Sequence, residues 1–205
     1  MPSGTYFPDP RHALTQKVSR ALHRAALAAG DDPARYSFAL VRAEEAQVYA
    51  DADAVFYVTD GLARLPVPVV EAVLAHEVAR EALQHVGRRR ALSLSTTAGF
   101  TVLGIIFPGA GLADFVVNPL LVRAFSRNQE KQADAKAVEI LRAMGYAAPR
   151  RALALALQTV DQANREKLPR GGILAARLPL AQRLAALEPL EPLPSSLAEA
   201  SPGPR

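Results

Sequence analysis

Residues 74–85 read LAHEVAREALQH, in which charged side chains stand in the middle of an apolar segment. The surrounding residues 69–87 are apolar nearly all round, which predicts a helix buried inside the domain. His76, Glu77 and Arg80 share one face of that helix. Because buried charges are costly without partners, we expect other elements to bring polar side chains to this face.

The spacing is that of a zinc-binding motif with one substitution. In an H-E-x-x-H helix the two histidines lie four residues apart, about 40° around the helix axis, so both bind one zinc while the Glu acts as base. Here the second position is Arg80, a fixed cation with no lone pair for a metal. His85 lies nine residues after His76, roughly 180° around the helix, and we interpret it as a packing residue.

Composition limits the class of protein. A chain of 205 residues is long enough for one domain plus a tail, and half of it is hydrophobic. It has no cysteine, so a metal would have to be bound by His, Asp, Glu or water. The net charge is +4, but no aromatic residues interleave with the basic ones, which argues against nucleic-acid binding. No secretory signal is recognised, and the expected location is the cytoplasm.

The N-terminal half predicts a helix followed by a small sheet. Asp9-Pro10 is a plausible start and Gly30 a stop for a helix of about twenty residues, in which His12 and His23 offer no ligand spacing. Residues 36–59 are rich in β-branched and aromatic residues, which predicts a short antiparallel sheet of two or three strands. Asp60-Gly61 ends this sheet with a turn.

The C-terminal half predicts three further helices and a tail. The apolar stretch 92–125 is interrupted by Pro108, Gly109 and Gly111, so we expect a buried or partly exposed helical hairpin, with membrane-surface contact as the alternative. Helices are then predicted through 126–145, from Pro149 to about Glu166, and near 181–187. Residues 188–205 are proline-rich and are expected to form a disordered tail.

Two carboxylates in the predicted helix 126–145 are candidates for the missing partners. Glu130 and Asp134 lie four residues apart in SRNQEKQAD and share a face. Alone they would be read as ordinary surface charge. A carboxylate from a later helix is, however, the usual third zinc ligand beside two histidines, and a second carboxylate one turn on can orient a ligand histidine.

Three blocks of the chain resemble the HtpX-like zinc metallopeptidases, relatives of the CAAX-prenyl endopeptidases of the gluzincin type. The blocks are VYADADAVFYVTDGL (48–62), EAVLAHEVAREALQH (71–85) and SRNQEKQADAKAVEILRAMGY (126–146). Their order and spacing agree over roughly residues 10–187. The resemblance implies a mainly helical α+β, zincin-like domain over 1–187, with a small antiparallel sheet before the motif helix.

The resemblance also implies roles for individual residues. His76 and Glu130 would be zinc ligands, Glu77 the general base, and Asp134 the residue that orients His76. Arg80 stands where the family has its other histidine ligand. Near the C-terminus, ARLPLAQRLAAL aligns so that Arg183 matches a family arginine, while Arg177, or Leu178 in the other register, replaces a histidine expected to stabilise the transition state.

Two functions of different class follow. The first is a degenerate peptidase without zinc, in which Arg80 and the carboxylates form a salt-bridged cluster and the protein acts by binding a peptide or protein. The alternative is an active zinc-dependent endopeptidase in which Glu77 activates the attacking water. A membrane-surface scaffold using residues 92–125 is a third reading. The sequence makes no prediction of the oligomeric state.

Overall fold

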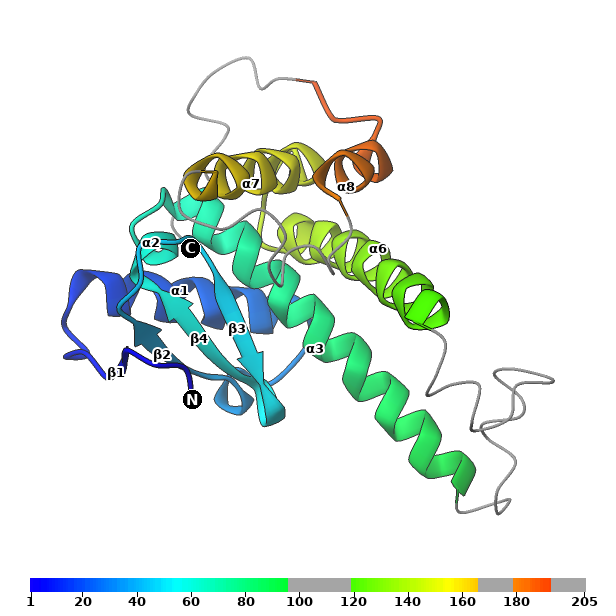
Figure 1. Cartoon of the computed structure of the whole chain (residues 1–205), viewed down its shortest axis with the longest axis horizontal. Coiled ribbons are helices and arrows are strands. Elements are labelled where there is room, and N and C mark those ends of the chain that lie inside the picture. Colours follow the sequence, from blue (N-terminus) through cyan, green and yellow to red (C-terminus); the bar gives the residue numbers. More distant parts are fainter. Residues whose placement is uncertain (96–118, 166–178, 193–205) are drawn as a thin grey trace.

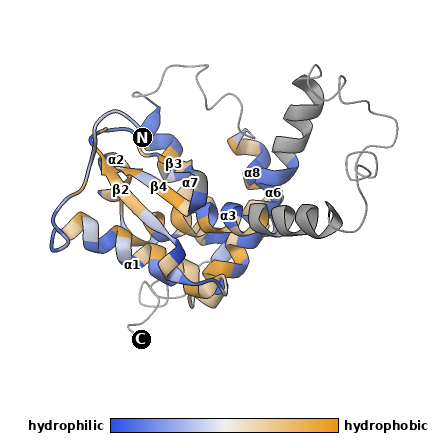
Figure 2. Ribbon diagram, turned by 90° about the horizontal axis from the view of Figure 1, so that it is seen from below, coloured by the Kyte–Doolittle hydropathy of each residue, from blue (hydrophilic) through white to orange (hydrophobic). Residues whose placement is uncertain are grey.

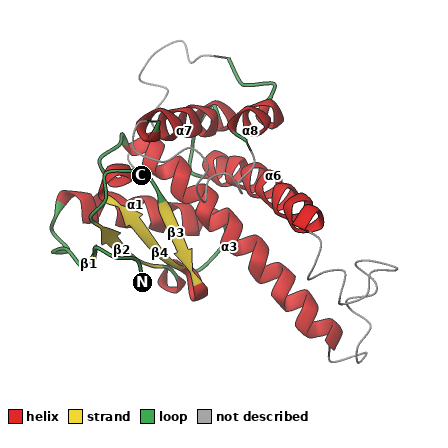
Figure 3. Ribbon diagram, viewed as in Figure 1, coloured by secondary structure: helices red, strands yellow, loops and turns green. Residues whose placement is uncertain are grey.

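The computed structural model describes residues 1–95, 119–165 and 179–192, and these form a mainly helical domain with one small sheet (Figures 1 and 3). The elements in chain order are β1 (Thr5–Tyr6), α1 (Ala13–Ala28), η1 (Pro33–Arg35), β2 (Ser37–Val41), β3 (Val48–Asp51), η2 (Ala52–Ala54), β4 (Val55–Thr59), α2 (Asp60–Ala63), α3 (Val67–Ser95), α6 (Pro119–Ala143), α7 (Pro149–Asn164) and α8 (Leu180–Leu187). The mainly helical prediction is confirmed.

Helix α3 crosses the centre of the molecule, with α1 and the sheet on one side and α6, α7 and α8 on the other (Figure 1). The predicted segment 69–87 is helical throughout, and the helix extends to Ser95. Small side chains such as Ala72, Ala75 and Ala79 are fully buried and let neighbouring helices approach closely. The motif helix is therefore the core helix, as its apolar composition predicts.

The strands predicted within residues 36–59 are present as β2, β3 and β4, but the prediction that the sheet is antiparallel is wrong. The sheet has four strands in the order β1-β2-β4-β3, and β2 pairs with β4 in parallel. The chain runs from β2 to the edge strand β3 and then folds back, so β4 enters between them and runs parallel to β2. Residue patterns predict that strands exist, but they do not specify strand order or direction.

The helix boundaries follow local capping chemistry. Helix α1 begins after His12, whose Nδ1 accepts from the backbone N–H of Leu14 at 3.3 Å, so the predicted start at Asp9-Pro10 is a few residues early. Apolar residues recur along this helix every three or four positions, with polar residues between them (Figure 2). Gly145 follows α6 with φ of 94°, which confirms the predicted stop.

Several predictions concern residues outside this description. The interior of the apolar stretch, 96–118, is not among the described residues, so the predicted hairpin stays a prediction. In the described part of the chain no helix is long and apolar enough to cross a membrane. Of the predicted tail, residues 193–205 lie outside the description, whereas Glu191 bonds to the start of α7.

Candidate functional site

Helices α3 and α6 bring the predicted site residues together. His76 Nδ1 lies 3.0 Å from Asp134 Oδ1, and His76 Nε2 lies 3.6 Å from Glu130 Oε2. Buried alanines flank the two carboxylates on α6 and allow it to pack closely on α3. The two carboxylates, whose roles were expected only from the family resemblance, therefore lie beside opposite nitrogens of one imidazole.

Arg80 points into this group and contacts three of its members through one nitrogen. Its Nη2 donates to Glu77 Oε1 at 3.1 Å, lies 3.3 Å from His76 Nε2, and lies 3.6 Å from Glu130 Oε1. Arg80 also has the most exposed side chain of the group at 23%, against 3% for Glu77. A guanidinium thus stands where a metal ion bound by His76 and Glu130 would have to lie.

Arg183 of α8 also enters this site: Arg80 lies near His76 Nε2, whereas Arg183 lies near His76 Nδ1. Its Nε donates to Asp134 Oδ2 at 2.9 Å and its Nη2 to Asp134 Oδ1, which is the bidentate arrangement that gives the strongest arginine–carboxylate pairs. Its Nη2 also lies 3.3 Å from His76 Nδ1, and its Nη1 lies 3.8 Å from Glu130 Oε2. Arg183 is therefore a member of the site.

From the sequence, Arg183 was expected to matter only because it matches a family arginine, and no partner was predicted for it. A local signal existed, because Arg183 lies on the same face of α8 as Leu187, and both are buried. A charged residue on the apolar face of a short amphipathic helix indicates a buried partner. The partner itself, 49 residues away in the sequence, has no such local signal.

The six side chains form what we call the site cluster: His76, Glu77, Arg80, Glu130, Asp134 and Arg183. Burial lowers the pKa of His76, but the carboxylates of Asp134 and Glu130 beside its two ring nitrogens outweigh it and raise that pKa overall. Burial raises the pKa of Glu130, yet His76, Arg80 and Arg183 bring it down to about 2. With His76 protonated, three cations face three carboxylates and the formal charges cancel.

The donor set does not fit a catalytic zinc site. Such sites use three protein ligands and a water, while here a guanidinium, which has no lone pair for a metal, places its Nη2 3.3 Å from His76 Nε2. Among the described residues, no group of three or more His, Cys, Asp or Glu side chains is arranged to hold a metal ion. Three atoms of the cluster are buried without a hydrogen-bond partner, namely Glu77 Oε2, Arg80 Nε and Glu130 Oε2, so the hydrogen bonding of the cluster is incomplete.

The remaining candidates lie elsewhere. His12 caps α1, and His23 is exposed on the same helix. His85 belongs to α3, but its side chain is outside the described part, as are Arg177 and Leu178, the two candidates for the position of the replaced histidine.

Helix α3, which carries His76 and Glu77, packs against α6, which carries Glu130 and Asp134, and this is the juxtaposition that the resemblance to zinc metallopeptidases implies. Comparison with protein-family models agrees: residues 12–191 match the model of Peptidase family M48. The chain belongs to this family. No curated protein matches it. Membership of the family supports a zincin-like fold.

Proposed function

We propose that this chain is a degenerate HtpX-like member of family M48, in which the site cluster replaces the zinc site and the protein acts by binding a peptide or protein. The observation that carries the proposal is the position of the Arg80 guanidinium, 3.1 Å from Glu77 and 3.3 Å from His76 Nε2. Arg80 neutralises carboxylates that would be costly to bury unpaired.

Electrostatics oppose the entry of zinc beside Arg80. A dication and a guanidinium about 4 Å apart repel by about 8 kcal/mol at an effective dielectric constant of about 20. The site has also lost one of its three protein ligands, which removes part of the favourable coordination energy. Zinc binding would therefore require Arg80 to leave the cluster.

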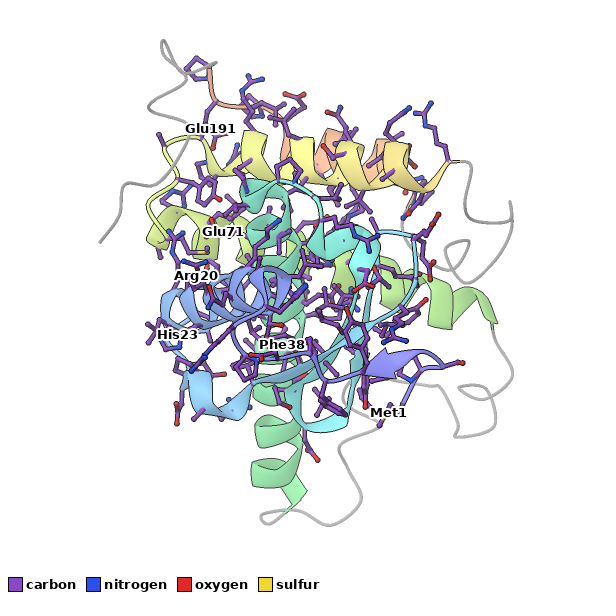
Figure 4. The ribbon with its side chains drawn as sticks, turned by 90° about the vertical axis from the view of Figure 1, so that its left-hand side faces the viewer. Met1, Arg20, His23, Phe38, Glu71 and Glu191 are labelled. Carbon is purple, nitrogen blue, oxygen red and sulfur yellow. The ribbon has the colours of Figure 1, made fainter. Side chains whose placement is uncertain are left out.

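Metal content tests the proposal. The full chain, purified without chelator or affinity tag, is incubated with excess zinc, desalted and analysed for zinc per chain. We expect far less than one zinc per chain for the wild type and close to one for Arg80→His. Arg20→His is the matched control, because Arg20 is exposed on α1 and its Nε bonds only within its own helix (Figure 4).

Near-stoichiometric zinc in the wild type would overturn the proposal. Failure of Arg80→His to bind zinc would show that this one position does not account for the loss of the metal.

The second candidate, an active zinc endopeptidase, draws on the exposure of Arg80. Because its side chain is the most exposed of the cluster, it is the member best able to turn away. Glu77, with Oε2 lacking a hydrogen-bond partner, is then placed to accept a proton from the attacking water. Hydrolysis of casein that is abolished both by chelator and by Glu77→Gln would favour this candidate over the first.

A further inference from the structure

The N-terminus of α7 has no cap of its own. Its N-cap residue, Ala148, makes no side-chain hydrogen bond, and Pro149 supplies no N–H. The next two backbone N–H groups are capped from 40 residues away, because Arg150 N donates to Glu191 Oε1 at 3.1 Å and Arg151 N donates to Glu191 Oε2 at 3.0 Å. A carboxylate is favourable at a helix N-terminus, because it accepts from the free N–H groups and its negative charge suits the helix dipole.

Further hydrogen bonds fasten the same segment, residues 188–192, which we call the strap. The guanidinium of Arg151 donates to the backbone oxygen of Glu191 through Nε at 2.7 Å and also through Nη2. Arg150 Nη1 donates to the backbone oxygen of Pro189 at 3.2 Å. Leu190 packs against the edge of the hydrophobic core. Figure 4 shows Glu191 beside the start of α7.

The strap directly follows α8, the helix that carries Arg183 into the site cluster. Helix α8 has eight residues, too few to be stable alone in water, so its position depends on its packing against α6 and α7 and on what holds its ends. Arg183 and Leu187 are buried on the inner face of α8. Beyond the C-terminal end of α8, Glu191 holds the chain through its hydrogen bonds to the start of α7. Arg183 and Glu191 are eight residues apart in the sequence.

We propose that Glu191 is a positioning residue for the site: by capping α7 it fixes the strap and α8, and so keeps Arg183 on Asp134. Asp134 in turn contacts His76 Nδ1 at 3.0 Å, so the strap controls how tightly the cluster is closed. Release of the strap frees Arg183 from Asp134 and loosens the cluster without unfolding the domain. The proposal rests on the proposed function only in treating the cluster as the former metal site.

Hydrogen–deuterium exchange of the full chain tests this coupling. Glu191→Ala is compared with Glu191→Gln, which keeps one acceptor oxygen, and with the control Glu139→Ala, which removes an exposed carboxylate from the surface of α6. We expect exchange in residues 180–187 to rise about fivefold in Glu191→Ala, less in Glu191→Gln, and not at all in the control. Exchange in α1 should stay unchanged in all three.

A second readout follows the guanidinium directly. Arg183 is 7% exposed, so phenylglyoxal should modify it slowly in the wild type and several-fold faster in Glu191→Ala, as located by mass spectrometry. Unchanged exchange and unchanged labelling in Glu191→Ala would overturn the proposal. So would an equal rise in α1 and α8, because it would give Glu191 a global structural role. Zinc content is measured separately, so failure of the strap and failure of the metal-free site give different results.

Discussion

Arg183 shows how much a single buried cation contributes to this site. It is paired bidentately with Asp134, whose side chain is almost fully buried, and it also lies near His76 and Glu130. Removing one partner of such a pair leaves an uncompensated charge in a poorly solvated place. The pairing therefore constrains both α6 and α8.

We expect Arg183→Met to lower the free energy of unfolding by about 3 kcal/mol, because Asp134 loses its bidentate partner. The control is Arg165→Met, since Arg165 is 66% exposed and pairs only with Asp161 at 3.2 Å among the described residues; its loss should cost at most about 0.5 kcal/mol. Urea unfolding measures both. Equal losses in the two variants would show that burial of the Arg183 pair adds nothing.

Gly61 lies in α2, just before the core helix α3, where the backbone passes very close to the connection between β2 and β3. A Cβ at this position would lie 2.1 Å from the backbone oxygen of Glu44 and 2.5 Å from that of Glu45, and both obstacles are main-chain atoms. The N–H of Gly61 also donates to Ala43 O at 2.9 Å. Only glycine allows α2 to approach the connection between β2 and β3 this closely.

We therefore expect Gly61→Ala to cost at least about 2 kcal/mol of stability. Gly30→Ala is the comparison, because a Cβ there meets nothing within 4 Å and only the positive φ of 75° is strained. That strain is worth about 1 kcal/mol. Thermal or urea unfolding measures the stability of both variants. If Gly61→Ala is as stable as Gly30→Ala or more stable, the close approach at Gly61 is contradicted.

At the scale of the element, the strap makes the stability of α7 and α8 depend on acid. Burial raises the pKa of Glu191, but the backbone N–H groups of Arg151 and Arg150 and the charge of Arg150 lower it below its usual range overall. A carboxyl group with a lowered folded-state pKa contributes stability above its unfolded pKa and loses it as pH falls through the folded value.

The difference in unfolding free energy between wild type and Glu191→Ala should accordingly shrink as the pH is lowered from about 6 to about 3. Glu191→Gln does not titrate, so its pH profile should follow that of Glu191→Ala. A difference that stays constant over this range would mean that the charge of Glu191 plays no part in capping α7.

At the scale of the whole molecule, a metal that binds only the folded state stabilises it by mass action. If the site cluster is metal-free, the unfolding temperature of the wild type should not change on adding either chelator or zinc. Arg80→His should be stabilised by zinc, by about 2.7 kcal/mol at a hundredfold excess over Kd, or about 5 to 10 °C. Calorimetry measures the shift, and chelator-sensitive unfolding of the wild type would argue for the zinc endopeptidase.

Much of the site was predictable because its residues occur in pairs four positions apart in the sequence. The four-residue step from His76 to Arg80 and that from Glu130 to Asp134 each place two side chains on one helical face. The resemblance of three blocks joined these two helices into one expected site, and the structure does bring them together.

Local sequence was enough to predict the helices, the residue types at the site and the presence of Arg80 one helical turn after His76, because helical periodicity and side-chain chemistry are local properties. The tertiary structure alone decided that β4 runs parallel to β2, that Arg183 reaches His76 across 107 residues, and that Glu191 caps α7. These contacts join residues far apart in the chain. They depend on how whole elements pack, and no local pattern encodes that packing.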